Sequence, residues 1–448
     1  MNTIFGLLPL SLIYLMLLYE FFIFNYHKIN FILLVYVSMD FEQGDLLEIK
    51  NKKGTFRGIL MPKHAFSGDD IIILKLENGY NIGLKIDEET EIRLISKKKE
   101  SGKTKSEIKE KSSGIQVSVL GTGGTIASYI DYNTGAVKPA VSQEELLLAL
   151  PEIEENYKIR SRVIFSILSE NMKVDHWKTL AREVEKELGN SNGVIIPHGT
   201  DTMSYTAAAL AFMVQNLPAP VVLVGAQRSS DRPSSDAYLN LISSLKLINT
   251  DLGEVVVSMH GSTSDNYVYV HRGVRVRKMH TSRRDAFKTI NDMPIAIIEE
   301  DVKFLSNYRK RSGPPILMEK MDPKVALLYY YPNMDPEIFF DIGSKLHGII
   351  IAGTGLGHVS EDLIPIIKDL TSRGIFVGIT SQCLYGSVNL NVYSTGREMI
   401  IAGAVPLKDM LPEVAYVKLM WVLANYPDNI KEKMLENIVG EISERRVA

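Results

Sequence analysis

Residues 117–128, VSVLGTGGTIAS, run from a β-branched stretch into glycines and then into two threonines and a serine. This order predicts a buried strand, a tight glycine turn and the start of a helix. A dinucleotide-binding loop would need a glycine where Ile126 stands, and a Walker loop would need a lysine that the stretch lacks. The residue types therefore argue against a phosphate cradle. They leave Thr125 at the head of a helix, either as an N-cap or as a chemical group.

A second stretch, VIIPHGTDTMSYTAAAL (194–210), repeats the order of strand, tight turn and helix, with Thr200 and Asp201 at the helix entrance. Ligands of open parallel sheets bind beyond the carboxyl ends of the strands, so we expect both threonine loops to face one crevice. An alcohol is a good nucleophile only when a base takes its proton or a cation lowers its pKa, and helix N-termini offer donors to an oxyanion. The two loops therefore indicate acyl transfer from a small amide, although Asp201 also suits a simple N-cap.

From Ile115 onward the chain alternates short β-branched runs with helical segments. This alternation is typical of a mostly parallel sheet covered by helices on both faces. The stretch RSGPP (311–315) marks a boundary, after which KVALLYYY (324–331) opens a second, smaller α/β unit. We predict an α/β fold with an N-terminal domain over residues 115–310 and a C-terminal domain over residues 316–448.

Residues 39–96, ahead of the α/β unit, show a different pattern. Short strands alternate with turn residues, and Asn78-Gly79 is a strong hairpin signal. The pattern predicts a small SH3-like all-β barrel, a type of domain that binds or docks. Residues 97–114 are rich in Lys, Glu and Ser, have no apolar period and are interpreted as a charged linker.

Residues 1–38 are strongly apolar. Their first run, IFGLLPLSLIYLMLLY (4–19), ends at Glu20 and is short of the roughly 20 apolar residues that a membrane span needs. A secretory signal would need a basic n-region and a small-residue cleavage site, which this segment lacks. We interpret the segment as upstream sequence joined by a misplaced start, with Met39 as the natural start. A membrane anchor is the alternative.

Composition narrows the function classes. A chain of 448 residues is long enough for two or three domains with buried cores. A net charge of −3 argues against a protein that coats nucleic acid, and a single cysteine excludes an intramolecular disulfide framework. The Cys and His spacing suggests no structural zinc, so we expect no metal site and a reducing, cytoplasmic setting.

The two threonine loops together, GTGGTIAS (121–128) and HGTDTMSYTAAAL (198–210), resemble the asparaginase-type amidohydrolases. The resemblance runs from about Val117 into the C-terminal region and implies an asparaginase-like fold of two α/β domains. It implies that Thr125 is the primary nucleophile. It also implies that Tyr132, in a flexible loop, accepts the proton of that threonine.

The same resemblance implies a second catalytic set, made of Thr200, Asp201 and Lys278. A lysine beside an aspartate and a hydroxyl would form a buried ion pair that polarises a water or relays a proton. Alternatively, Lys278 is one charge of a basic strip. Separately, the basic strip at 272–284 is a candidate contact for tRNA. The arginines of this strip are Arg272, Arg275, Arg277, Arg283 and Arg284.

Substrate contacts are also implied by the resemblance. Ser169, in LSENMK (168–173), matches the contact to the substrate carboxylate, and Glu170 and Gly199 are expected at the same site. Glu170 and Asn171 stand where many free asparaginases have Gln-Asp. The substrate pocket therefore departs from the common pattern of those enzymes at this point.

The order of barrel, linker and asparaginase-like unit resembles the D-subunit family of the archaeal glutamyl-tRNA(Gln) amidotransferases, and SQCLYGSVNLNVYSTGRE (381–398) is similar to that family as well. The resemblance implies a glutaminase with a threonine nucleophile, and it leaves asparagine open as a second substrate. Ammonia would pass to a GatE-like E subunit. The ligase complex would use ATP and Mg²⁺ to convert Glu-tRNA(Gln) to Gln-tRNA(Gln), while the D subunit binds no cofactor and forms a homodimeric core.

Other functions compete with this interpretation. A free L-asparaginase would need no N-terminal docking barrel. A membrane-tethered, non-enzymatic binding protein would need residues 1–38 as its anchor. A cysteine-dependent glutaminase would use Cys383, but SQCLYG (381–386) lacks the Gly-x-Cys-x-Gly elbow that presents a nucleophile. We therefore expect Cys383 to be a small buried residue.

Overall fold

The computed structural model describes residues 41–42, 44–61, 70–76, 81–87, 89–97, 114–123, 128–131, 136–139, 157–228 and 235–443. The predictions for segment 1–38, for most of the charged linker, for Thr125 and for Tyr132 lie outside the described residues. The chain divides into two compact units. One holds the N-terminal strands and the other holds the α/β domains.

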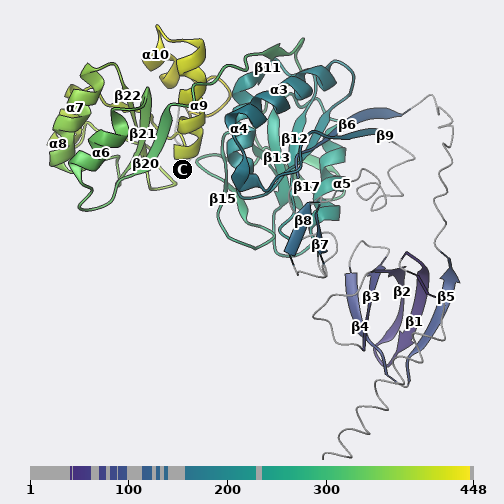
Figure 1. Ribbon diagram of the computed structural model, residues 1–448. Coiled ribbons are helices and arrows are strands. Elements are labelled where there is room, and N and C mark those ends of the chain that lie inside the picture. Colours follow the sequence, from purple (N-terminus) through teal and green to yellow (C-terminus); the bar gives the residue numbers. More distant parts are fainter. Residues whose placement is uncertain are drawn as a thin grey trace, which may run out of the picture. The chain divides into compact units, whose positions relative to one another are not determined.

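The N-terminal unit is all-β, with five antiparallel strands in the order β4-β3-β2-β1-β5 (Figure 1). The strands are β1 (Leu46–Asn51), β2 (Gly54–Leu60), β3 (Ile71–Leu76), β4 (Asn81–Lys85) and β5 (Glu91–Ser96). Alternate residues of β1, Leu47 and Ile49, are fully buried and pack with Ile72, Leu74 and Leu84. The predicted N-terminal all-β domain is confirmed.

The larger unit is built on an eight-stranded sheet in the order β18-β17-β14-β13-β12-β10-β6-β9. Its strands are β6 (Ile115–Gly121), β9 (Tyr157–Val163), β10 (Val194–Pro197), β12 (Val221–Val224), β13 (Val255–His260), β14 (Val268–Arg272), β17 (Ala296–Ile298) and β18 (Val302–Phe304). The strands from β13 to β9 are parallel, and β14, β17 and β18 add an antiparallel edge. β10, β12 and β13 are buried at every position, as expected where both faces of a sheet are covered.

Helices cover both faces of this sheet. They are α3 (Val174–Leu188), α4 (Met203–Met213) and α5 (Ala237–Leu247). α3 and α4 pack with Ile196 and Leu223 on one face, while α5 packs with Ile195 and Val222 on the other. Neighbouring residues of one strand point to opposite faces of the sheet. A strand that is apolar at every position therefore contributes side chains to the apolar cores on both faces. The predicted two-sided α/β sheet is confirmed.

The C-terminal α/β domain has a smaller parallel sheet in the order β20-β21-β22-β23. Its elements are β20 (Val325–Tyr329), α6 (Pro336–Gly343), β21 (Gly348–Gly353), α7 (Ile364–Ser372), β22 (Phe376–Ser381), α8 (Ser394–Ile401), β23 (Val405–Pro406), α9 (Pro412–Asn425) and α10 (Ile430–Leu435). Figure 1 shows α9 between this sheet and α4. Trp421 of α9 stacks on Phe212 of α4, with ring centroids 5.7 Å apart. The two α/β domains therefore share one apolar core.

Short strand pairs complete the larger unit. They are β7 (Ser128–Asp131) with β8 (Ala136–Pro139), β11 (Val214–Gln215) with β19 (Ile316–Leu317), and β15 (Val276–Lys278) with β16 (Phe287–Thr289). The β15–β16 pair matters most here because β15 ends at Lys278. Among the described residues, every helix is too short or too polar to cross a lipid bilayer.

Candidate active site

The loops after β6 and β10 leave the sheet next to each other. Thr122 directly follows β6 and is buried. Its hydroxyl donates to the carbonyl of Pro197, the last residue of β10, at 2.8 Å, and its backbone N–H donates to the same oxygen at 3.2 Å. Thr125 follows shortly afterwards, outside the described residues. The described start of its loop thus adjoins the loop that carries Thr200.

Gly123 allows the first loop to approach the segment after β9. Its φ is +98°, a left-handed conformation that favours glycine. A Cβ at this position would collide with the backbone of Ile167, which donates its N–H to the carbonyl of Thr122 at 3.3 Å. This glycine of the opening motif therefore permits the close approach of two backbones.

Two of the predicted substrate contacts, Ser169 and Gly199, lie against each other. A Cβ on Gly199 would lie 2.8 Å from Oγ of Ser169, so the position has room only for glycine. Thr202 donates its hydroxyl to the carbonyl of Ser169 at 2.7 Å, which ties the short helix η2 (Ser169–Asn171) to the entrance of α4. Ser169 is buried, whereas the third predicted contact, Glu170, is exposed.

The second predicted catalytic set gathers around one ammonium group. Nζ of Lys278 donates to Oγ1 of Thr200 at 2.9 Å and to Oδ1 of Asp201 at 2.7 Å. Thr200 is buried, and the side chains of Lys278 and Asp201 are 13% and 68% exposed. The expectation of a buried ion pair is wrong for Asp201. Its exposed carboxylate keeps most of its hydration, so the pair forms without the cost of desolvating both charges.

This arrangement suits proton transfer. The oxygen of Thr200 accepts a hydrogen bond from the ammonium, so the hydrogen of the hydroxyl remains free for another acceptor. A nearby cation favours the negative charge that develops on an oxygen during attack on an amide. The exposed carboxylate of Asp201 can also bind a positively charged group of a ligand. The set can therefore activate a water and anchor an amino-acid substrate.

His198 belongs to this site, although no spacing in the sequence singles it out. The residue is fully buried between Pro197 and Gly199, and its Nδ1 lies 2.7 Å from the carbonyl oxygen of Gly199. Burial lowers the pKa of His198 to about 4. The ring is therefore neutral at pH 7 and carries its hydrogen on Nδ1. We conclude that His198 shapes the turn before Thr200.

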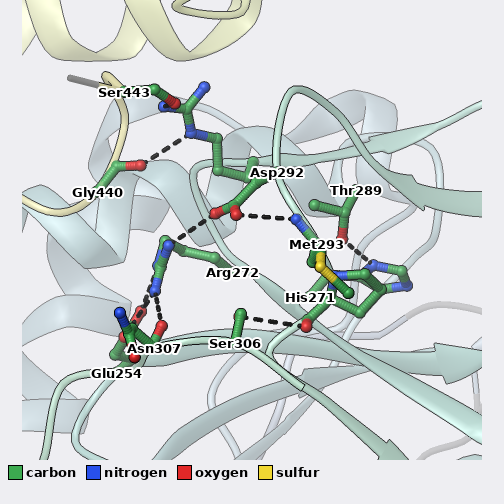
Figure 2. Close-up of polar contacts among 12 residues, drawn as sticks. Glu254, His271, Arg272, Thr289, Asp292, Met293, Ser306, Asn307, Gly440 and Ser443 are labelled. Atoms are coloured by element: carbon green, nitrogen blue, oxygen red, sulfur yellow. Dashed lines mark hydrogen bonds and ion pairs between the residues drawn. The ribbon is translucent and has the colours of Figure 1, made fainter. Parts of the chain in front are cut away.

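The predicted basic strip is not a free basic surface. Its arginines all bind carboxylates: Arg272 binds Glu254 and Asp292, Arg275 binds Asp409, Arg277 binds Glu413, Arg283 binds Asp285 and Arg284 binds Asp265. Figure 2 shows the guanidinium of Arg272 between Glu254 and Asp292. Most of these carboxylates come from distant parts of the sequence. A strip with built-in counterions is poorly suited to phosphates, so the structure argues against a tRNA contact there.

Cys383 is exposed in the loop after β22, so the expectation of a buried cysteine is wrong. Its N–H donates to Oγ of Ser381 at 3.0 Å. The described part of the chain holds no group of three or more His, Cys, Asp or Glu side chains that could bind a metal ion.

Family models match three parts of the chain. The "GatD N-terminal domain" matches residues 41–95, "Asparaginase, N-terminal" matches residues 116–310, and "Glutaminase/Asparaginase C-terminal domain" matches residues 324–434. Among solved structures, the thermostable L-asparaginase from Thermococcus kodakarensis is 33% identical with a TM-score of 0.69, over 74% of this chain and 100% of that chain. L-asparaginase I from Vibrio cholerae is 26% identical with a TM-score of 0.65, again over 74% and 100%.

Similar proteins extend the match across the N-terminal unit. The glutamyl-tRNA(Gln) amidotransferase D subunit of Saccharolobus islandicus is 49% identical over 420 residues, which cover 91% of this chain and 94% of the relative. The D subunit of Pyrococcus furiosus is 52% identical over 416 residues, 90% of this chain and 95% of the relative. These matches confirm both resemblances drawn from the sequence. The chain belongs to the D-subunit family of the glutamyl-tRNA(Gln) amidotransferases.

Proposed function

We propose that this chain is the glutaminase component of a glutamyl-tRNA(Gln) amidotransferase and releases ammonia from the side-chain amide of glutamine. Membership of the D-subunit family supplies the reaction class. The observation that carries the chemistry is the ammonium of Lys278, which bridges the hydroxyl of Thr200 and the carboxylate of Asp201. An ammonium with a reachable acceptor on one side and a hydroxyl on the other can move a proton during amide hydrolysis.

The proposed reaction has two stages. In the first stage, the hydroxyl oxygen of Thr125 forms a bond to the amide carbon while Tyr132 takes the proton. That proton passes to the amide nitrogen, the C–N bond breaks, and ammonia leaves. In the second stage, Thr200 and Lys278 activate a water that attacks the acyl ester. Glutamate is released, and the oxygen of Thr125 regains a proton.

The substrate is proposed to bind through its α groups. The buried hydroxyl of Ser169, packed on Gly199, is suited to donate to an α-carboxylate. The carboxylate of Asp201 is 68% exposed and is suited to an α-ammonium group. Glu170 is exposed beside Ser169 and is proposed to line the same entrance. These contacts hold either glutamine or asparagine, so side-chain length must be sensed elsewhere in the site.

The partner is proposed to be a GatE-like E subunit. In that complex the ammonia would be used to convert Glu-tRNA(Gln) to Gln-tRNA(Gln), with ATP and Mg²⁺ bound by the E subunit and a homodimer of this chain as the core. Free L-asparaginase activity is the second candidate, and it is favoured by the similarity to solved asparaginases over 74% of the chain. The family match over residues 41–95 favours the amidotransferase.

The test uses Thr125→Ala and Thr200→Ala in the full chain, assembled with its E subunit. Each variant is expected to abolish catalytic turnover of glutamine while the complex still forms: Thr125→Ala should release no ammonia, and Thr200→Ala should release at most one ammonia per chain. Added ammonium should restore tRNA amidation, because only the ammonia source is lost. Failure of ammonium to restore amidation in an intact complex would contradict the proposal. Fast asparagine turnover by the chain alone, without glutamine turnover, would favour a free asparaginase.

A further inference from the structure

The β15–β16 hairpin, whose first strand ends at Lys278, is anchored to the large sheet by an arginine. Arg284 lies in the segment that connects β15 to β16, and its Nη1 donates to Oδ1 of Asp265 at 2.7 Å. Its Nη2 donates to the carbonyl of Thr263 at 2.5 Å. Both acceptors lie in the loop after β13. Arg284 therefore ties the hairpin of Lys278 to the carboxyl end of β13.

A buried histidine continues this contact into the core. Oδ1 of Asp265 lies 3.0 Å from Nε2 of His260, the fully buried last residue of β13. Nδ1 of His260 lies 2.6 Å from Oδ1 of Asn240 on α5, which is also fully buried. Asn240 donates its Nδ2 to the carbonyl of Gly225 at 2.9 Å. The side chains of Arg284, Asp265, His260 and Asn240 form an unbroken series of contacts, which we call the brace.

Gly225 brings the brace to the other side of the candidate site. A Cβ on this glycine would lie 2.9 Å from Cγ2 of Thr200 and 2.9 Å from the carbonyl of His198. The backbone of Gly225 therefore packs directly against the turn that carries Thr200. The brace begins at the hairpin of Lys278 and ends behind Thr200, so it connects both partners of the 2.9 Å contact between Nζ and Oγ1.

We propose that the four members of the brace are positioning residues that keep Nζ of Lys278 within hydrogen-bond distance of Oγ1 of Thr200. The inference rests on the proposed function, in which this pair moves a proton. A lysine side chain is flexible, so the place of its Nζ depends on a backbone that does not move. A misplacement of about 1 Å costs on the order of 10²-fold in rate.

The experiment compares Arg284→Ala with Arg283→Ala in the full chain. Arg283 belongs to the same hairpin, and its side chain is 52% exposed. Among the described residues, that side chain binds Asp285 alone, at 2.7 Å. Its replacement removes the same charge and leaves the brace intact. We expect Arg284→Ala to lower kcat for glutamine hydrolysis by roughly 10- to 100-fold, with KM nearly unchanged. Arg284→Lys should recover part of the loss, and Arg283→Ala should match the wild type.

A second measurement separates the brace from the proposed function. The reactivity of the Lys278 amine toward an acylating reagent is followed by mass spectrometry, with no glutamine present. Loss of the brace should raise labelling of Lys278 several-fold in Arg284→Ala and leave it unchanged in Arg283→Ala. If the wild type hydrolyses no glutamine, the proposed function fails, and the labelling still decides about the brace.

A double-mutant cycle tests whether the brace acts as one unit. Asp265→Ala removes this contact together with the contact to Nε2 of His260, and losses within one unit are not additive. The double variant Arg284→Ala/Asp265→Ala should therefore lose no more activity than Asp265→Ala alone. Any of three results would overturn the inference. The first is a kcat and a Lys278 labelling in Arg284→Ala that equal those of the wild type. The second is a loss of kcat in Arg283→Ala as large as that in Arg284→Ala, and the third is a fully additive loss in the double variant.

Discussion

Two lysines of the larger unit bind carboxylates in opposite surroundings. Lys418, on α9, lies 2.6 Å from Glu441, and both side chains are 0% exposed. Its Nζ also donates to the carbonyls of Met434 at 3.1 Å and Glu436 at 2.5 Å. Lys278 instead shares its Nζ between a buried hydroxyl and a carboxylate that is 68% exposed.

The difference separates a structural ion pair from one that can take part in a reaction. The acceptors around Lys418 are parts of the folded core, so this lysine fastens the C-terminal segment to α9. Burial lowers the pKa of Lys418, and the nearby Glu441 opposes that shift. The carboxylate beside Lys278 is open to solvent and to a ligand. A lysine that moves protons needs such an acceptor, whereas a buried lysine needs complete pairing.

Replacing Lys278 should have the largest effect among the changes that test this comparison of the two lysines. Lys278→Met is expected to lower the rate of ammonia release from glutamine by about 10³-fold, because a positioned proton-transfer group contributes roughly 10²- to 10⁴-fold. The free energy of unfolding should change by less than about 1 kcal/mol, since a pair with one exposed partner adds little stability. An ammonia assay and a denaturant titration measure the two quantities. If Lys278→Met kept the wild-type rate of ammonia release, Lys278 would have a structural role like that of Lys418.

Replacing Lys418 should have the opposite profile. Lys418→Met leaves the buried carboxylate of Glu441 without its cation, which is expected to lower the free energy of unfolding by about 3–5 kcal/mol. The double variant Lys418→Met/Glu441→Leu removes both charges and should recover most of that loss. Urea unfolding measures the free energy of unfolding of the single and of the double variant. A single variant as stable as the wild type would show that the buried pair is not structural.

Two buried histidines extend the comparison to pH. Burial lowers the pKa of His198 to about 4 and that of His271 to about 3, so both rings stay neutral in the folded protein. In the unfolded chain they titrate near the ordinary pKa of about 6.5 and bind protons as the pH falls. Stability should therefore drop by about 2 kcal/mol per histidine between pH 7 and pH 5.

The slope of unfolding free energy against pH measures this effect, and His271→Asn provides the matched control. Nδ1 of His271 lies 2.7 Å from Oγ1 of Thr289, beside the hairpin of Lys278. The variant should show a shallower slope because one titrating group is gone. Equal slopes for the variant and the wild type would contradict the assignment of a buried neutral ring.

The smallest effect is expected at an exposed pair. Nζ of Lys310 lies 2.9 Å from Oδ2 of Asp251, and the two side chains are 75% and 47% exposed. Such a pair is weakened by solvent and salt, so Lys310→Ala should leave the midpoint of thermal unfolding unchanged within error. A clear drop in that midpoint would mean that exposure does not separate weak pairs from strong ones in this protein.

The α/β fold and the adjacency of the segments after β6 and β10 could be predicted from strand and loop patterns, whereas the helix expected after the first glycine turn was wrong at Ser128, where β7 begins. Continuous apolar runs such as 194–197 report a strand buried on both faces, and a polar loop after each strand reports the ligand side of the sheet. The exposure of Asp201 could not be predicted, because it depends on which way the turn between β10 and α4 faces. The exposure of Cys383 depends in the same way on the course of a loop.

The brace, and the ion pairs between the arginines of the basic strip and their carboxylates, could not be predicted from the sequence either. Arg275 and Asp409 are 134 residues apart, and no local pattern connects them. In the sequence, Asn240 and His260 resemble ordinary polar residues. Their contact arises only because α5 packs against β13 in the folded protein. Hydrogen bonds between separate elements are fixed by tertiary packing, which a single sequence does not encode in any short spacing.

The most direct test of the account is to identify the atom that carries the acyl group. Thr200→Ala is incubated with glutamine, quenched in acid and digested for mass spectrometry. We predict a glutamyl ester on the peptide that contains Thr125, because the first threonine attacks and the second stage is blocked. A glutamyl group on the peptide that contains Cys383, or ammonia release with no acyl group on the chain, would contradict the account.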